Sequence, residues 1–497
     1  MKRPFLRVLL VLPALMAHFV CGAQIIGPRT LTMQDVVQLA QENSITSISN
    51  RNTFVASYWS FRSYKAQLLP SLSLNANLME YTRTLDKLQD FNTGAVAFRT
   101  SYNMNNSAAL NLSQNIPLTG GRVSLSTSLQ RLDQYSPSRL TSYYTQPIYL
   151  TYAQSLWGFN QFKWNKKTQP LQYEIAKRQY IESMESLNQN AVQMFWDCVT
   201  AKENYERALK SFEEGKRLFE AGQTRFEMGT ITRDQLMQIE VRVLNDSLSL
   251  TNSRVTLRTN MNRLCSYIGY QEDTELNLVV DYNIPKVVLS YDDVLERALQ
   301  NSSFKLKQDQ QYIQADESVA RAKSERGLSA QFNARLGMSG SSEKFRDTFI
   351  ELKDQEQIGI QLNIPILDWG QARGRVRMAE AQAEYTRNSL EQSMIDFRQE
   401  LYTKVMTFND QYSQCEIAKR AADLANESYE LALKNFGSGS MTMTQLDQLK
   451  DKRDSALSTY MSKVAGFWRS YFDIRRTTLY DYSSGTDIST EFDKLVK

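Results

Sequence analysis

Four stretches of the chain alternate between apolar and polar residues with a period of two, the pattern of a β-strand whose faces meet different surroundings. In the clearest stretch, Leu328, Phe332 and Leu336 share one face, and Gln331 and Asn333 share the other. The longer stretches have about 9–11 residues, the length of a tilted membrane-spanning strand. The four predicted strands are residues 72–78, 147–157, 328–338 and 358–366.

A soluble sheet packed on helices would alternate equally well, but aromatic residues gather where the second strand of each predicted pair ends. An interfacial aromatic girdle produces this arrangement in membrane barrels. The candidate membrane-interface aromatics are Trp157, Phe159, Phe162 and Trp164 after one strand and Trp369 after the other.

A sheet that spans a bilayer must close on itself, because lipid satisfies no backbone hydrogen bonds at an open edge. Barrels begin at about eight strands, so four strands cannot close. We therefore expect several copies to pool their strands, and three copies would give twelve.

A second alternating pair, residues 109–116 and 123–129, lies between the first two predicted strands, with Gly120 and Gly121 at its turn. It belongs to an insertion of 48 residues that the second half of the chain lacks. We interpret this insertion, which lies within about residues 80–147, as a hairpin added on the outer face. The pattern leaves open that it widens the barrel instead.

Two long stretches, about residues 162–226 and 373–436, contain no proline except Pro170 near the start of the first. A continuous helix over either would be roughly 95–100 Å long. Apolar residues then recur every seven positions after the first stretch, which predicts coiled-coil packing. The recurring residues are Leu236, Val243, Leu250, Leu257 and Leu264, joined on the same seam by Ile239 and Met261.

The chain contains an internal duplication. FEMGTITRDQL, which begins at Phe226, returns as FGSGSMTMTQL at Phe436, an offset of 210 positions, and LTMQDVVQLAQENS (31–44) returns as LSYDDVLERALQNS (289–302) at an offset of 258. We expect a first repeat over residues 24–288 and a second over 289–478, before a C-terminal tail at 479–497. The first holds a helix, a strand pair with the inserted hairpin, a helical hairpin at 161–268 and a connector; the second holds a helix, a strand pair at 328–366 and a helical hairpin at 371–476.

The duplicated phrases encode helix ends. Gly229 and Gly439 suit the left-handed residue that closes a helix. Threonine three positions later and glutamine three further on form the T-x-x-Q pattern of a capping box, at Thr232–Gln235 and Thr442–Gln445. Thr32 with Asp35, and Ser290 with Asp293, predict two further boxes.

Residues 1–23 have a basic start and an apolar run, as a secretory signal peptide does. Its removal takes away three basic residues and His18, the only histidine, and lowers the formal charge from +4 to +1. This balance gives no basic footprint for nucleic acid. Cys198, Cys265 and Cys415 lack metal-ligand spacing and suit buried helix positions. We predict no catalytic residue, metal site or cofactor.

These features together resemble the TolC-like outer-membrane efflux and secretion proteins. The resemblance rests on the doubled order of strands and long helices, the paired tip phrases around Gly229 and Gly439, and NIPILDWGQ (363–371), which leads from a strand into a helix. It implies a mixed fold with a coiled-coil α-helical barrel and a transmembrane β-barrel pooled by a homotrimer. Twelve strands would cross the outer membrane and contact its lipid, and the helices would cross the periplasm.

The resemblance also implies partners: a periplasmic adaptor (membrane-fusion) protein and an inner-membrane pump of the RND or ABC class. The channel would be a passive duct without catalysis. Tip residues expected to dock the adaptor are Phe226, Gly229, Thr230, Gly439 and Ser440.

In this family the periplasmic aperture is often guarded by acidic residues six and nine positions after the second tip glycine. Here those positions hold Gln445 and Gln448, with Asp447 between them. We expect an amide-lined aperture, with Phe436 at its entrance as a plug or as packing between tips. Gln445 also suits the capping box, and Asp447 a solvated surface.

The alternative hypothesis is a periplasmic coiled-coil adaptor or scaffold without a pore, since long helices alone fit both. The apolar strand face with its aromatic belt favours the duct.

Overall fold

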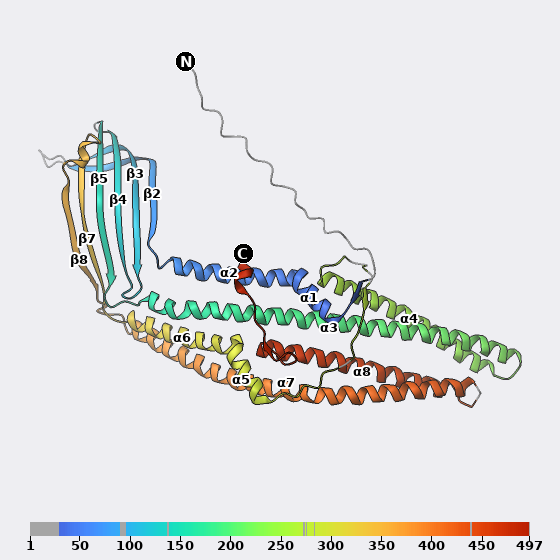
Figure 1. Cartoon of the computed structure of the whole chain (residues 1–497). Helices are drawn as coiled ribbons and strands as arrows, with labels where there is room; N and C mark the ends of the chain where they lie inside the picture. The colour runs from blue at the N-terminus through green and yellow to red at the C-terminus, as the bar shows by residue number, and fades with distance from the viewer. Residues whose placement is uncertain are drawn as a thin grey trace, which may run out of the picture. The chain divides into compact units, whose positions relative to one another are not determined.

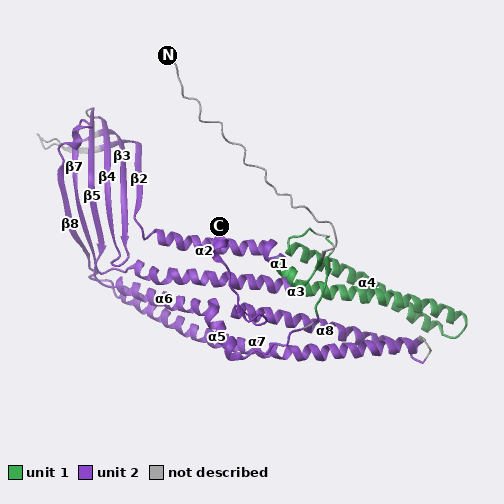
Figure 2. Ribbon diagram, viewed as in Figure 1, with its two compact units in different colours: residues 1–38, 194–281 green, residues 39–193, 282–497 purple. Residues whose placement is uncertain are grey.

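The computed structural model describes residues 29–89, 96–136, 139–271, 274, 276–282, 284–437 and 440–496. The expected signal peptide and the tip glycine Gly439 therefore lie outside the described residues. The chain divides into two compact units (Figure 2). Unit 1 holds residues 1–38 and 194–281, and unit 2 holds residues 39–193 and 282–497.

Unit 2 contains a six-stranded antiparallel sheet with the order β2-β3-β4-β5-β7-β8 (Figure 1). Among the described residues, β2 and β8 each have a strand neighbour on one side only. The strands are β2 (Ser71–Gln89), β3 (Val96–Ile116), β4 (Gly121–Ser136), β5 (Leu140–Ser155), β7 (Ser329–Ser342) and β8 (Lys353–Asn363).

The expectation that the insertion is a hairpin outside the sheet is wrong. Its strands β3 and β4 lie between β2 and β5, hydrogen-bonded on both sides. The sheet of one chain therefore has six strands rather than the four expected. The physical reason is that an alternating pair can continue a ladder of backbone hydrogen bonds wherever its neighbours offer a free edge. The last predicted strand also ends earlier, at Asn363 rather than Ile366.

The sheet has one apolar and one polar face. A row of leucines crosses five strands in register, and each of these side chains is exposed in the single chain. Residues of the opposite face are mainly hydroxyl and amide side chains. The row runs Leu72–Leu112–Leu125–Leu150–Leu336.

Long helices follow or precede the strands. The helices α3 (Gln161–Glu227) and α7 (Gln371–Gly437) each have 67 residues, about 100 Å at 1.5 Å per residue. In unit 2, α7 packs against α8 (Met443–Thr478) and α6 (Ser303–Ser324), and α5 (Tyr291–Asn301) contacts α7 and α8. The α2 helix (Ile45–Ala66) leads into β2.

In unit 1, the second part of α3 is followed by α4 (Arg233–Tyr267), and the short strands β1 (Arg29–Leu31) and β6 (Leu276–Leu278) pair in parallel. The predicted seven-residue seam is the inward face of α4: Ile239 and Leu250 are 6% and 7% exposed, and Leu264 is fully buried. The helix α1 (Met33–Asn43) begins in this unit.

The C-terminal tail of unit 2 packs back on the helices. It contains β9 (Tyr480–Asp481), β10 (Thr486–Asp487) and α9 (Phe492–Val496). Phe492 lies 5.1 Å from the ring of Phe54 on α2, and Arg51 donates to the Leu495 carbonyl (3.0 Å).

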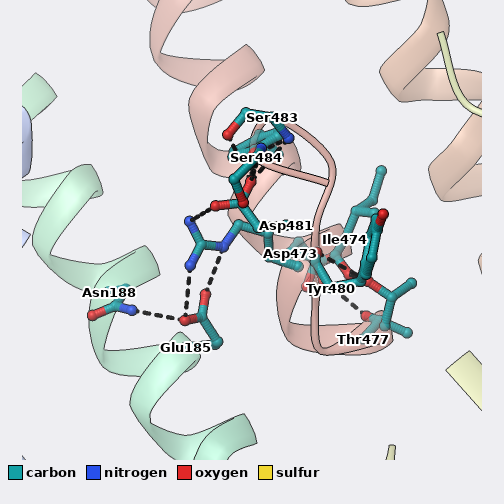
Figure 3. A network of polar contacts seen from close by, with 12 residues as sticks. Glu185, Asn188, Asp473, Ile474, Thr477, Tyr480, Asp481, Ser483 and Ser484 are labelled. Atoms are coloured by element: carbon teal, nitrogen blue, oxygen red, sulfur yellow. Dashed lines mark hydrogen bonds and ion pairs between the residues drawn. The ribbon is translucent and has the colours of Figure 1, made fainter. Parts of the chain in front are cut away.

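A charged network fixes the start of this tail (Figure 3). Arg475 joins Glu185 on α3 (3.1 Å) to Asp481 (3.2 Å), and Asn188 donates to Glu185 (3.0 Å). Burial raises the pKa of Glu185 even though Arg475 opposes this shift. Burial would also raise the pKa of Asp481, but hydrogen bonds from Ser483 and Tyr471 lower it to about 2. The network holds two sequence-distant helices and the tail together.

Arg475→Met should destabilise the protein by about 3–5 kcal/mol, because Glu185 is 3% exposed and would lose its cation in the interior. Lys494→Met removes the exposed ion pair with Glu491 and should cost less than about 1 kcal/mol. Thermal unfolding of the detergent-extracted protein measures the loss of stability in both variants. Adding Glu185→Gln to Arg475→Met should restore part of the loss. Equal melting temperatures for the two single variants would contradict this role of the network.

Candidate functional site

The aromatic residues expected at the membrane interface fall into two groups. Trp157 is 58% exposed directly after β5, and Trp369 is 89% exposed before α7. Phe159 and Trp164 instead stack on each other, 6.5 Å apart, and Arg321 lies over the Phe159 ring (4.5 Å). Phe162 is half-buried near the start of α3. Only the two exposed tryptophans of this set are thus free to meet lipid headgroups.

The aromatic pattern did not reveal exposed aliphatic residues in the β3–β4 turn and between β8 and α7. Leu118 is 88% exposed, Ile366 94% and Leu367 70%. A signal was present, since apolar residues beside prolines at 117 and 365 have little reason to occur in a solvated loop. Like Trp157 and Trp369, they are apolar residues that one chain leaves exposed.

Local hydrogen bonds explain the turn that presents Trp369. Its φ of 53° and that of Gly370, 84°, are left-handed. Asp368 accepts from the backbone N–H of Gly370 (2.9 Å) and of Ala372 (3.0 Å) at the start of α7. The Ala372 and Gly370 N–H groups lower the pKa of the Asp368 carboxyl. This anion at a helix N-terminus stabilises the strand-to-helix turn.

The tip of unit 1 is built as the sequence predicts. Gly229 has a φ of 71°, its N–H donates to the Phe226 carbonyl (2.9 Å), and the Thr230 N–H donates to the Arg225 carbonyl (2.9 Å). These two bonds form a Schellman motif. Thr232 and Gln235 then make both bonds of the capping box. Phe226, Gly229 and Thr230 are all exposed residues.

Close packing under this tip depends on Gly222. A Cβ atom there would lie 3.0 Å from Ile239, 3.5 Å from Leu236 and 4.0 Å from Ile231. Leu236 and Ile231 have the spacing of a hydrophobic staple across the cap, five positions apart on either side of Thr232. The missing side chain lets α4 approach α3.

The tip of unit 2 repeats the design. The Ser440 N–H and Oγ both donate to the Asn435 carbonyl (3.1 and 3.0 Å), and Thr442 and Gln445 form a complete capping box. Leu446 is fully buried. The Gln445 amide oxygen accepts from the Thr442 N–H (3.0 Å), so its role in the cap is confirmed.

The aperture candidates lie on both sides of this cap. Gln445 and Gln448 are exposed, whereas Asp447 and Phe436 are half-buried. Gln445 and Gln448 are one helical turn apart on α8, so both amides can face the same space.

A further hollow of about 430 Å³ in unit 2 lies among α3, α6, α7 and α8. Its charged lining is largely engaged in internal contacts. Glu182 accepts from the N–H (2.6 Å) and Oγ (2.8 Å) of Ser303, and Lys404 pairs with Glu400 and Asp473 (both 2.9 Å). These contacts suit a structural junction.

The predicted burial of the cysteines is confirmed: Cys198, Cys265 and Cys415 are all buried thiols that form no disulfide. Burial raises the pKa of the Cys198 thiol to about 12 and that of Cys415 to about 11. Within the described ranges, three or more histidine, cysteine, aspartate or glutamate residues nowhere gather as a metal site would require. None of the helices described here has a stretch long and apolar enough to cross a membrane.

Residues 294–461 match the family model of outer membrane efflux proteins. No curated protein sequence matches the chain. Several solved channel structures have the same fold. The CmeC outer membrane channel of Campylobacter jejuni is 16% identical over 93% of this chain and 88% of its own, with a TM-score of 0.63. The outer membrane protein VceC of Vibrio cholerae is 11% identical over 92% and 97%, with a TM-score of 0.62.

The open state of the MtrE outer membrane channel of Neisseria gonorrhoeae is 14% identical over 92% of this chain and 91% of its own, with a TM-score of 0.59. The expected mixed fold of long helices and an antiparallel sheet is confirmed. Residues 294–461 are therefore similar to the outer membrane efflux proteins, and the chain as a whole shares its fold with these outer membrane channel structures.

Proposed function

We propose that the protein is the passive outer-membrane exit duct of a tripartite efflux or type I secretion system. The observation that carries this proposal is the six-stranded sheet with an exposed apolar face, joined directly to helices of 67 residues. The sheet lies in the outer membrane and the helices extend into the periplasm. Substrate passes from an adaptor and an inner-membrane pump to the exterior.

The exposed leucine row argues against the periplasmic scaffold. Leu72 is 65% exposed and Leu74 69% in the single chain. A contiguous apolar band of this kind marks a surface that meets lipid or a partner. A scaffold in water would have no use for it.

The chain works as a homotrimer in this proposal. The pump partner, of the RND or ABC class, supplies the energy, since the duct itself performs no catalysis. The adaptor docks on the helical tips, through Phe226, Gly229 and Thr230 in one repeat and Gly439 and Ser440 in the other. Small residues at these turns let a partner helix approach closely.

The periplasmic aperture is lined by Gln445 and Gln448, with Phe436 and Asp447 beside them. Neutral amides at this position give a weaker preference for cations than a carboxylate ring would. Trp157 and Trp369 mark the membrane interface at the periplasmic end of the sheet.

Native mass measurement of the detergent-extracted protein should give three copies of the chain. Closure in a bilayer requires more than one chain, because neither edge of the sheet closes within a single chain, and the TolC-like channels that this chain resembles are homotrimers. A stable folded monomer in the outer-membrane extract would contradict the duct and favour the scaffold.

Gln445→Asp with Gln448→Asp should increase the cation selectivity of the closed channel, because three copies would place six new carboxylates around the aperture. Reversal potentials across a salt gradient in a planar bilayer measure the change. Aspartate also keeps an acceptor at position N3 of the cap, so folding should persist.

The matched control is Gln235→Asp with Gln238→Asp, which makes the same change at the tip of the first repeat. This control should leave selectivity nearly unchanged. An equal shift of the reversal potential in both double variants, or no shift in either, would show that Gln445 and Gln448 do not line the aperture.

A further inference from the structure

We propose that the inserted strands β3 and β4 form part of the membrane wall in the assembled channel, so that three copies close an eighteen-stranded barrel. The wide bore would pass bulky polar cargo and leave size selection to the helical tips. This inference rests on the proposed function, and it adds the width and the lining of the exit.

The ladder through the insertion is continuous. The pairing of β3 with β4 runs from Ile116↔Gly121 to Asn103↔Gln134 without a shift, and one irregularity follows at Tyr102. On the other side, β3 follows β2 from Ser71↔Ser113 outward, with one irregularity between Asn77 and Glu80. Strands held on both sides in this way belong to the sheet itself.

The apolar face of the insertion coincides with that of its neighbours. Leu110 and Leu112 on β3 lie opposite Leu74 and Leu72 on β2, and Leu112 lies opposite Leu125 on β4. Leu110, Leu112 and Leu125 are 39%, 40% and 42% exposed. A hairpin outside the barrel would have no reason to place its leucines in line with the lipid-facing leucines of the wall.

The polar face coincides as well. Gln130 on β4 donates to Asn105 on β3 (2.8 Å), and Ser128 donates to Gln146 on β5 (3.3 Å). Gln146 in turn donates to Gln355 on β8 (3.0 Å). Amide and hydroxyl groups thus cross from the insertion into the flanking strands on one face.

The turn of the insertion, residues 117–120, and the adjoining end of β3 are held by side-chain hydrogen bonds on both sides, at the helical end of the sheet. Gln154 donates to the Thr119 carbonyl (2.8 Å), and Asn160 to the Pro117 carbonyl (3.2 Å). On the other side, Gln114 donates to the Leu68 carbonyl (2.8 Å) and Asn115 to that of Gln67 (3.2 Å). These contacts join the turn to the regular strand–helix junctions of the wall.

The strand number is consistent with ring closure. Six antiparallel strands leave β2 and β8 running in opposite directions. When β8 of one copy meets β2 of the next, the new pair is again antiparallel, so a head-to-tail ring can close. An odd number of strands per chain would force a parallel pair at each junction.

Closure with eighteen strands widens the bore. At about 4.8 Å between strands and a tilt of about 40–45°, eighteen strands enclose a backbone cylinder roughly 37 Å across and twelve roughly 25 Å. Barrels of sixteen to eighteen strands leave an aqueous channel. The lining from β3 and β4 is mostly uncharged, so it would not select cargo by charge. Its residues include Asn105, Ser107 and Asn111 on β3 and Ser124, Ser126, Ser128 and Gln130 on β4.

The test compares the whole chain with a variant in which an Asn-Gly turn replaces residues 90–138, which removes β3 and β4. This two-residue hairpin turn would place Leu85 opposite Tyr143, both from the apolar face, and so keep the faces aligned. The measurement is the largest polyethylene glycol that enters from the extracellular side of a planar bilayer. Addition from this side probes the barrel independently of the periplasmic aperture.

The cut-off radius of the whole chain should be about 1.5-fold that of the variant, following the ratio of strand numbers, and both should be trimers. If both proteins form trimeric channels with the same cut-off radius, the eighteen-stranded barrel would be overturned, but the proposed function would stand. Absence of any channel or of the trimer in the whole chain would overturn the proposed function.

Thiol labelling tests the same point without a deletion, in case the shortened chain does not fold. Ser126→Cys lies on the polar face and Leu125→Cys on the apolar face of β4, and the mature cysteines within the structure are buried. In trimers embedded in lipid vesicles, a membrane-impermeant thiol reagent should label Ser126→Cys at least tenfold faster than Leu125→Cys. Equal labelling would place β4 in water on both faces and overturn the inference.

Discussion

Hydrogen bonding along the edges of the sheet is the constraint on which the rest of the structure depends. Among the described residues, β2 and β8 each have a strand neighbour on one side only, and lipid would offer the outer N–H and C=O groups of these strands no partner. The apolar face makes water an equally poor surrounding. The ring of copies proposed above would solve both problems, and the long helices would then form the wall of the duct below the sheet.

The sequence predicted the parts governed by local pattern. The seven-residue seam around Leu250, the capping boxes at Thr232 and Thr442 and the closing turn at Gly229 depend on neighbours within a few positions. Strand alternation likewise showed which residues share a face. Among the candidate site residues, the pattern located the two tips but could not separate exposed Trp157 from Trp164, which stacks on Phe159.

Competition between partners explains where the same local rules fail. Thr32 and Asp35 form the expected reciprocal box. Ser290 makes no side-chain cap, and Asp293 instead pairs with Arg297 (3.0 Å).

The position of the insertion within the sheet could not be predicted, because it too depends on a choice between partners. Alternation describes two faces of a strand, but edge pairing is a long-range choice that the residues of β3 and β4 do not encode alone.

The folded-back tail has a consequence for the timing of folding. Arg475 binds both Glu185 on α3 and Asp481 in the tail, and Phe492 packs on Phe54 of α2, so partners separated by several hundred residues must meet. Such non-local contacts form late, since the chain between them must first be ordered. The helices of unit 2 therefore reach their final packing only after the last residues have been synthesised. A prematurely terminated chain would lack these contacts and would be more easily cleaved by proteases.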